Sequence, residues 1–180
     1  MPGKIILPVN YPKHEGNIIF LAGPVMSAPR WQNESIKRIK KLDSDVNIAC
    51  PSYEIEDEYI GDNFLGFDEL PLNYDNCWPE VDWQMHYLEE AFTKGCLLFW
   101  LAREINHQCS YPYAQGTRSE LFSKLNSEGN LVLGIEDGFS GDKYTRYYFN
   151  KKRSETPIFS TLKETCQAAV DLARKNRKHF

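Results

Sequence analysis

Short apolar runs that recur along the chain, separated by amphipathic segments, most constrain the fold of this sequence. Each run is rich in β-branched or aromatic side chains and shows no polar alternation, which is typical of strands buried on both faces of a parallel sheet. The sequence predicts five such strands, over residues 18–22, 46–50, 96–102, 131–135 and 157–160.

Amphipathic segments between these runs predict helices over residues 30–42, 79–94, 116–126 and 162–175. In the first of them the apolar side chains fall near one face. Strands that alternate with helices through short links favour a parallel sheet covered on both sides by right-handed crossovers. We therefore expect an α/β, flavodoxin-like (Rossmann-type) three-layer sandwich with a five-stranded parallel sheet of order 2-1-3-4-5.

The length of 180 residues is that of one compact domain, so we expect residues 1–180 to form a single domain. Residues 1–17 are interpreted as a flanking strand or arm. Residues 51–78 interrupt the alternation and combine many acidic and aromatic side chains. Long segments of this kind are often functional, and the aromatic content favours an ordered lid loop.

Composition and charge exclude several classes of protein. The net charge of −4 disfavours binding to a nucleic-acid polymer. The longest apolar runs have five to seven residues, far below the ~20 that a membrane span needs. The five cysteines are unclustered and form no C-x-x-C pair, as in a reducing cytoplasm, and neither Cys nor His has metal-site spacing. We expect a cytoplasmic protein that binds neither a membrane nor a metal.

In a doubly wound sheet the ligand crevice lies beyond the carboxyl ends of the strands. Gly23 and Pro24 follow the first predicted strand, but the glycines of a dinucleotide-binding fingerprint are missing. The chain also has no phosphate-cradling G-x-x-x-x-G-K-[ST] motif and no serine nucleophile elbow. We therefore expect no cofactor, and a flavin-binding flavodoxin is a weak alternative.

A pair of carboxylates, Asp82 and Glu120, is predicted near the starts of two helices that flank the third strand. Two carboxyls that converge on one crevice can act as nucleophile and general acid at a glycosidic bond. A helix start favours an ionised Glu120, which suits a nucleophile. The negative charge of Glu120 would in turn favour a protonated Asp82.

Several segments, in this order, resemble the nucleoside 2-deoxyribosyltransferase-like family. The resemblance covers roughly residues 18–150, and its motifs are IIFLAGP at 18–24 followed by Trp31, VDWQ at 81–84, LFWL at 98–101 and GTRSELF at 116–122. It implies a flavodoxin-like fold, Glu120 as the nucleophile at the sugar C1′, and Asp82 as the residue that assists the leaving base. Family members often carry a Tyr in the first strand, where this chain has Ile18, Ile19 and Phe20, and an Asp at the end of the third strand, where it has Ala102, Arg103 and Glu104.

The residues expected to contact substrate are Gly23, Pro24, Trp83, Gln84, Gly116, Thr117 and Arg118. Trp83 is interpreted either as a core side chain or as a wall that stacks on a base, and Gln84 could bind a base edge. Arg118 could bind a substrate phosphate or pair with an acid of residues 51–78.

Together these features predict an enzyme that acts on the N-glycosidic bond of a small-molecule nucleoside or nucleotide. It would transfer a (deoxy)ribosyl group to another base or to water through a covalent glycosyl-Glu120 intermediate. A non-catalytic nucleotide-binding or sensing module on the same fold is the alternative. The resemblance also implies a homo-oligomer, because family members have tyrosine-bearing subunit contacts where this chain has Tyr144, Tyr147 and Tyr148; a hydrophobic plug is the simpler interpretation of that segment.

Overall fold

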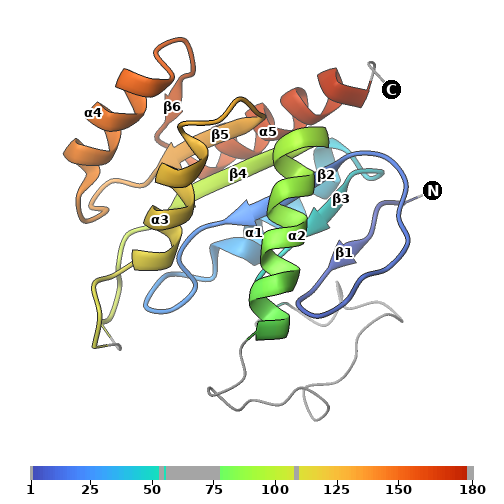
Figure 1. Ribbon diagram of the computed structural model, residues 1–180, viewed down its shortest axis with the longest axis horizontal. Coiled ribbons are helices and arrows are strands. Elements are labelled where there is room, and N and C mark those ends of the chain that lie inside the picture. The colour runs from blue at the N-terminus through green and yellow to red at the C-terminus, as the bar shows by residue number, and fades with distance from the viewer. Residues whose placement is uncertain (1, 53–54, 56–77, 108–109, 178–180) are drawn as a thin grey trace.

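The computed structural model describes residues 2–52, 55, 78–107 and 110–177 (Figure 1). These residues form an α/β structure in which a six-stranded sheet, with all strands parallel, is flanked by five helices. The strands are β1 (Ile5–Ile6), β2 (Ile18–Ala22), β3 (Asn47–Ala49), β4 (Cys96–Leu101), β5 (Leu131–Ile135) and β6 (Ile158–Phe159). The helices are α1 (Trp31–Leu42), α2 (Trp78–Lys94), α3 (Gln115–Lys124), α4 (Asp142–Lys152) and α5 (Leu162–Arg177).

The strand order is β1-β3-β2-β4-β5-β6, so the predicted five-stranded sheet of order 2-1-3-4-5 is wrong in count and in order. The difference is strand β1, which adds an edge beside β3, while the five predicted strands keep their expected neighbours. Ile5 and Ile6 pair with Ile48 and Ala49 of β3. A strand of two residues is too short to produce a recognisable apolar run, and the sequence therefore predicted only a flanking arm or strand.

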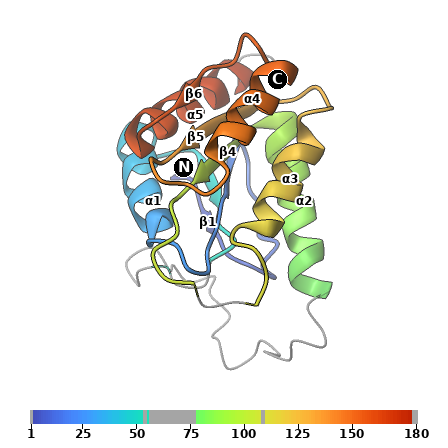
Figure 2. The ribbon, with the colours of Figure 1, turned by 90° about the vertical axis from the view of Figure 1, so that its left-hand side faces the viewer.

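Alternate side chains of the strands enter two separate cores, one on each face of the sheet. Ile18 and Phe20 of β2 pack under α2, α3 and α4, whereas Ile19 and Leu21 pack under α1 and α5. Figure 2 shows the sheet between these two helical layers. Because both faces are covered, strands β2, β4 and β5 are buried throughout and carry the continuous apolar runs visible in the sequence.

Helix α4 was missed by the sequence prediction. Only Thr145 and Phe149 of this helix are buried, and an amphipathic stripe is therefore hard to recognise. Tyr144 and Tyr147 are 63% and 64% exposed, so the interpretation of this segment as a hydrophobic plug is wrong for these two side chains. A subunit contact at this helix stays a prediction.

Two further predictions concern a lid loop and membrane-spanning segments. The predicted lid over residues 51–78 lies almost entirely outside the described residues. Of the helices that the structure does describe, none has the length and hydropathy to cross a bilayer.

Candidate functional site

A cavity of about 370 Å³ lies where the carboxyl end of β2 meets α2 and α3. We call it the Glu120 pocket. Its lining residues are Phe20, Ala22, Gly23, Pro24, Val25, Met26, Pro51, Gln84, Tyr111, Tyr113, Ala114, Gln115, Gly116, Thr117 and Glu120. The set includes six of the nine predicted site residues, because the rule that ligands bind beyond the carboxyl ends of parallel strands applies to this sheet.

Close packing fixes the wall of the pocket that follows β2. A Cβ on Gly23 would lie 2.4 Å from the Trp100 carbonyl oxygen and 2.5 Å from Cζ2 of Trp31. Only glycine fits between these groups without a shift of the backbone. The Trp31 indole Nε1 donates a hydrogen bond to the Pro24 carbonyl oxygen at 2.9 Å. This bond holds the segment after Gly23 against helix α1.

Glu120 provides the ionisable carboxyl group of the pocket. Burial raises the pKa of Glu120 from an ordinary value of 4.5 to about 7. Across the pocket, Nε2 of Gln84 on α2 donates a hydrogen bond to Oε1 of Glu120. The carboxyl group is therefore held between two helices and is about half ionised near neutral pH.

The expected effect of the helix start on Glu120 is not what the structure shows. Helix α3 begins at Gln115, so Glu120 lies in the second turn, and the first turn contains no acidic residue. The field of a helix end falls off within the first turn. Burial therefore dominates, and the prediction that the helix start keeps Glu120 ionised is wrong.

Two tyrosines and a methionine that the sequence analysis did not select also line the pocket. The Tyr113 hydroxyl donates to the Ala102 carbonyl oxygen at 2.8 Å, and burial raises the pKa of this tyrosine. The Tyr111 hydroxyl lies 3.3 Å from Sδ of Met26 and joins two sides of the pocket. The location of Tyr111 and Tyr113 in the long segment between the third predicted strand and its helix was the one available signal for these two residues, since long links often carry function.

Asp82 lies outside the Glu120 pocket. Its side chain is exposed and lines a different, shallow hollow together with Tyr11 and His86. Burial raises the pKa of Tyr11, and the charge of Asp82 raises it further. Residues two apart on a helix point about 200° away from each other, so Asp82 faces away from the side that carries Gln84. The expectation that Asp82 and Glu120 converge on one crevice is therefore wrong.

Trp83 is a core side chain, which was one of its two predicted roles. It is fully buried, packs against Phe20 and Tyr87 at ring centroid distances of 6.1 and 5.1 Å, and is absent from the lining of the Glu120 pocket. Its Nε1 donates to the Asn10 carbonyl oxygen at 2.9 Å. This bond ties α2 to the segment between β1 and β2, so Trp83 anchors the helix that carries Gln84.

Arg118 is directed away from the Glu120 pocket. Its Nη2 donates to the Ser140 carbonyl oxygen at 2.5 Å, and its guanidinium lies 5.0 Å from the centre of the Phe139 ring. Both contacts belong to the link between β5 and α4, so the prediction that Arg118 contacts substrate is not supported by its placement. The predicted alternative, a pair with an acid of residues 51–78, involves residues outside those described.

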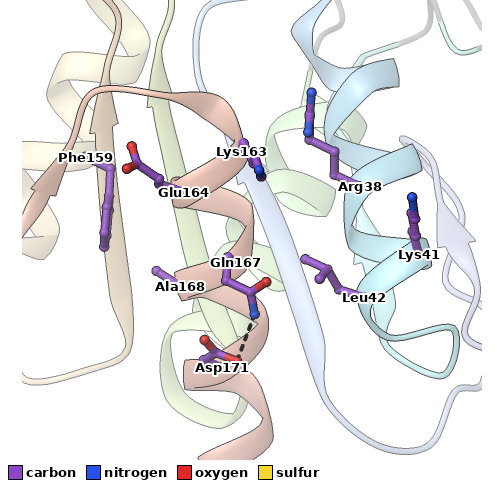
Figure 3. Close-up of a pocket in the computed structure, with 9 residues that line it drawn as sticks. All are labelled: Arg38, Lys41, Leu42, Phe159, Lys163, Glu164, Gln167, Ala168 and Asp171. Carbon is purple, nitrogen blue, oxygen red and sulfur yellow. Dashed lines mark hydrogen bonds between the residues drawn. The ribbon is translucent and has the colours of Figure 1, made fainter.

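A second cavity of about 550 Å³ lies between α1 and α5 (Figure 3). Two of its polar side chains have local partners: Arg38 pairs with Glu34 at 2.6 Å, and Gln167 donates to Asp171 at 3.1 Å. A perturbed titratable group inside a cavity is the stronger sign of a functional site, so we place the candidate site at Glu120.

Comparisons with known proteins add no further evidence on this site. No protein-family model and no curated protein matches the chain. Within the described ranges, no group of three or more His, Cys, Asp or Glu side chains could hold a metal ion. The geometry around Glu120 is therefore the basis for assigning a function.

Proposed function

We propose that the protein cleaves the N-glycosidic bond of a nucleoside or nucleotide, with Glu120 as the nucleophile. The observation that carries this proposal is a buried carboxyl group, held by Gln84, in a cavity beyond the carboxyl ends of the strands. The parallel α/β sheet is consistent with a flavodoxin-like fold. The resemblance to the nucleoside 2-deoxyribosyltransferase-like family also supports Glu120 as the nucleophile.

The reaction takes place in two displacements at C1′ of the sugar. In the first, an oxygen of the Glu120 carboxylate bonds to C1′ while the C1′–N bond breaks, and the base leaves with the electron pair and takes up a proton. In the second, water or another base bonds to C1′ and gives up a proton. As that bond forms, the bond between C1′ and the Glu120 oxygen breaks, and its electron pair returns to the Glu120 carboxylate. Both steps pass through an oxocarbenium-like transition state.

The pKa of Glu120 sets the pH at which this chemistry can begin. Only the carboxylate can attack C1′, and half of the molecules hold it at a pH of about 7. We therefore expect the rate of the first displacement to increase from pH 6 to pH 8. We assign no catalytic role to Asp82, because its side chain lies on the other side of α2, and the leaving base takes its proton from solvent.

The proposal is tested with a panel of 2′-deoxyribonucleosides, ribonucleosides and their 5′-phosphates. Free base is measured by chromatography, and transfer is measured by incorporation of a labelled free base into intact nucleoside. Label exchange would identify a transferase, whereas release of free sugar alone would identify a hydrolase. We expect one of these activities in the wild type and its loss in Glu120→Gln. Neither base release nor exchange across the whole panel would contradict the proposal.

A non-catalytic nucleotide-binding module is the second candidate. One observation favours it: Glu120 is the only carboxyl group among the described residues that line the pocket, whereas most glycosidic-bond enzymes use a pair. Calorimetry with the same panel separates the two candidates. Tight binding without any base release would favour the binding module, and turnover would favour the enzyme.

A further inference from the structure

We propose that Gln84 is a positioning residue, which fixes one oxygen of the Glu120 carboxylate and leaves the other available to attack C1′. The catalytic meaning of this inference rests on the proposed function, whereas the hydrogen bond itself does not. The sequence predicts a different role for Gln84, a contact with a base edge. In the structure, Nε2 of Gln84 instead donates to Oε1 of Glu120 across the pocket.

Helix α2 presents the Gln84 amide from a rigid position. The preceding residue, Trp83, is fully buried and bonded to the Asn10 carbonyl oxygen. Tyr87, one turn further along, is also buried, and its ring lies 5.1 Å from that of Trp83. Gln84 is itself partly buried, which restricts the rotamers of its side chain. A donor that is held in place by packing can orient a carboxylate without being ordered again in each turnover.

The electrostatic surroundings make this one bond important. The parts of the pocket wall contributed by β2, by residues 23–26 and by α2 carry no charged side chain. The other titratable groups in the described lining are the hydroxyls of Tyr111 and Tyr113, and the guanidinium of Arg118 is engaged by Ser140. A hydrogen bond from the Gln84 amide to the Glu120 carboxylate therefore opposes the cost of burying that charge. Hydrogen bonds to an ionised partner are roughly twice as strong as neutral ones.

An amide suits this role because it orients the carboxylate without adding a charge. A lysine or arginine at the same place would favour the ionised form more strongly and would also pair with the anion that must attack C1′. The Gln84 amide supplies direction and a limited stabilisation. It thereby opposes the effect of burial, which raises the pKa of Glu120 to about 7.

The test replaces the amide by an apolar side chain of similar length, Gln84→Met. Glutamate carboxyl carbons are labelled with ¹³C, and the Glu120 signal is assigned from its loss in Glu120→Gln. Titration by NMR should show the Glu120 midpoint about one pH unit higher in Gln84→Met, equivalent to about a tenfold change in the ionisation equilibrium. Gln84→Asn, whose amide is too short to reach, should move the midpoint in the same direction and serves if Gln84→Met does not fold.

The matched control is Gln167→Met, which makes the same chemical change in the cavity between α1 and α5. Gln167 bonds Asp171 on its own helix and does not line the Glu120 pocket, so the Glu120 midpoint should stay at its wild-type pH. In activity assays, Gln84→Met should lower kcat more than it changes KM. Part of the loss should persist at pH 9, where Glu120 is ionised in both proteins, because orientation is also lost.

The possible results are distinct. An unchanged midpoint in Gln84→Met would overturn the inference. A lowered midpoint would overturn it too, because it would mean that protonated Glu120 donates to the Gln84 carbonyl oxygen. If the midpoint rises but the wild type releases no base from any nucleoside, the hydrogen bond stands and the proposed function fails.

Discussion

Helix α2 separates two carboxyl groups that occupy opposite chemical environments. On the side toward α3, Glu120 is enclosed in a pocket, bonded to Gln84, and has a pKa raised to about 7 by burial. On the side toward residues 11–14, Asp82 is exposed and lines an open hollow. Asp82 and Gln84 are only two residues apart in the chain. Residues two apart on a helix point in nearly opposite directions, so Gln84 faces Glu120 and the pocket whereas Asp82 faces the open hollow.

The largest expected effect is the difference in kcat/KM between variants that lack one or the other carboxyl group. Glu120→Gln should lower kcat/KM by roughly 10³-fold or more, because the amide cannot attack C1′. Asp82→Asn should change kcat/KM by less than about threefold, since its side chain lies outside the pocket. Steady-state kinetics of base release by the two variants measures the difference. Losses of similar size would mean that both carboxyl groups take part in the reaction.

The pH dependence of stability should distinguish the same two residues. Unfolded Glu120 loses its proton near pH 4.5, but the folded protein retains it to about pH 7, so the native state binds more protons in between. The free energy of unfolding should therefore decrease as pH rises through this window, by a contribution of roughly 3 kcal/mol from this group. Urea unfolding from pH 4.5 to 8 measures the slope.

Two variants serve as references for that slope. Glu120→Gln should lose its contribution, since the amide does not titrate, and Asp82→Asn should keep it. If Glu120→Gln retained the wild-type slope, another group would be responsible for it.

A smaller effect, on stability, is expected from Trp83, the core residue that lies between Asp82 and Gln84 in the chain. Trp83→Phe should lower the free energy of unfolding by about 2 kcal/mol, because a buried ring shrinks and the Asn10 carbonyl oxygen loses its donor. KM should stay within about twofold of the wild type, since Trp83 does not line the Glu120 pocket. Urea unfolding and kinetics check the two parts. A large rise in KM with unchanged stability would favour the alternative in which Trp83 stacks on a base.

The smallest effect concerns Gly116, which lines the pocket from the first turn of α3. A Cβ at this position meets no heavy atom within 4 Å. Gly116→Ala should therefore stabilise the protein, by up to about 1 kcal/mol, through a higher helix propensity. It should raise KM if the substrate approaches the backbone here. A stabilised variant with unchanged KM would place the substrate elsewhere in the pocket.

Much of the fold could be predicted because buried parallel strands produce continuous apolar runs. The runs at β2 and β5 gave the same bounds that the structure shows. Two elements gave no such signal. Strand β1 has two residues, and α4 buries only Thr145 and Phe149, so neither shows a clear periodic pattern. Strand β1 also accounts for the wrong strand count and order.

Part of the candidate site could be predicted because ligands bind beyond the carboxyl ends of parallel strands. The position of strand ends selected Gly23, Pro24, Gly116 and Glu120, which do line the pocket. The sequence could not show which side of α2 faces α3, because that depends on the packing of Trp83 into the core. The start of α3 was predicted one residue late, and Glu120 was assigned to the helix start although it lies in the second turn. Its raised pKa depends on burial, which the local sequence does not reveal.

Mass spectrometry of the intact protein shows whether Glu120 attacks the sugar. The wild type is incubated with each nucleoside or nucleotide of the panel, quenched in acid and measured, and the site of any adduct is then found by peptide mapping. We expect a sugar-sized mass increase on the peptide that contains Glu120, present in Asp82→Asn and absent in Glu120→Gln. Turnover with a sugar adduct on another residue, or with an adduct that persists in Glu120→Gln, would contradict it.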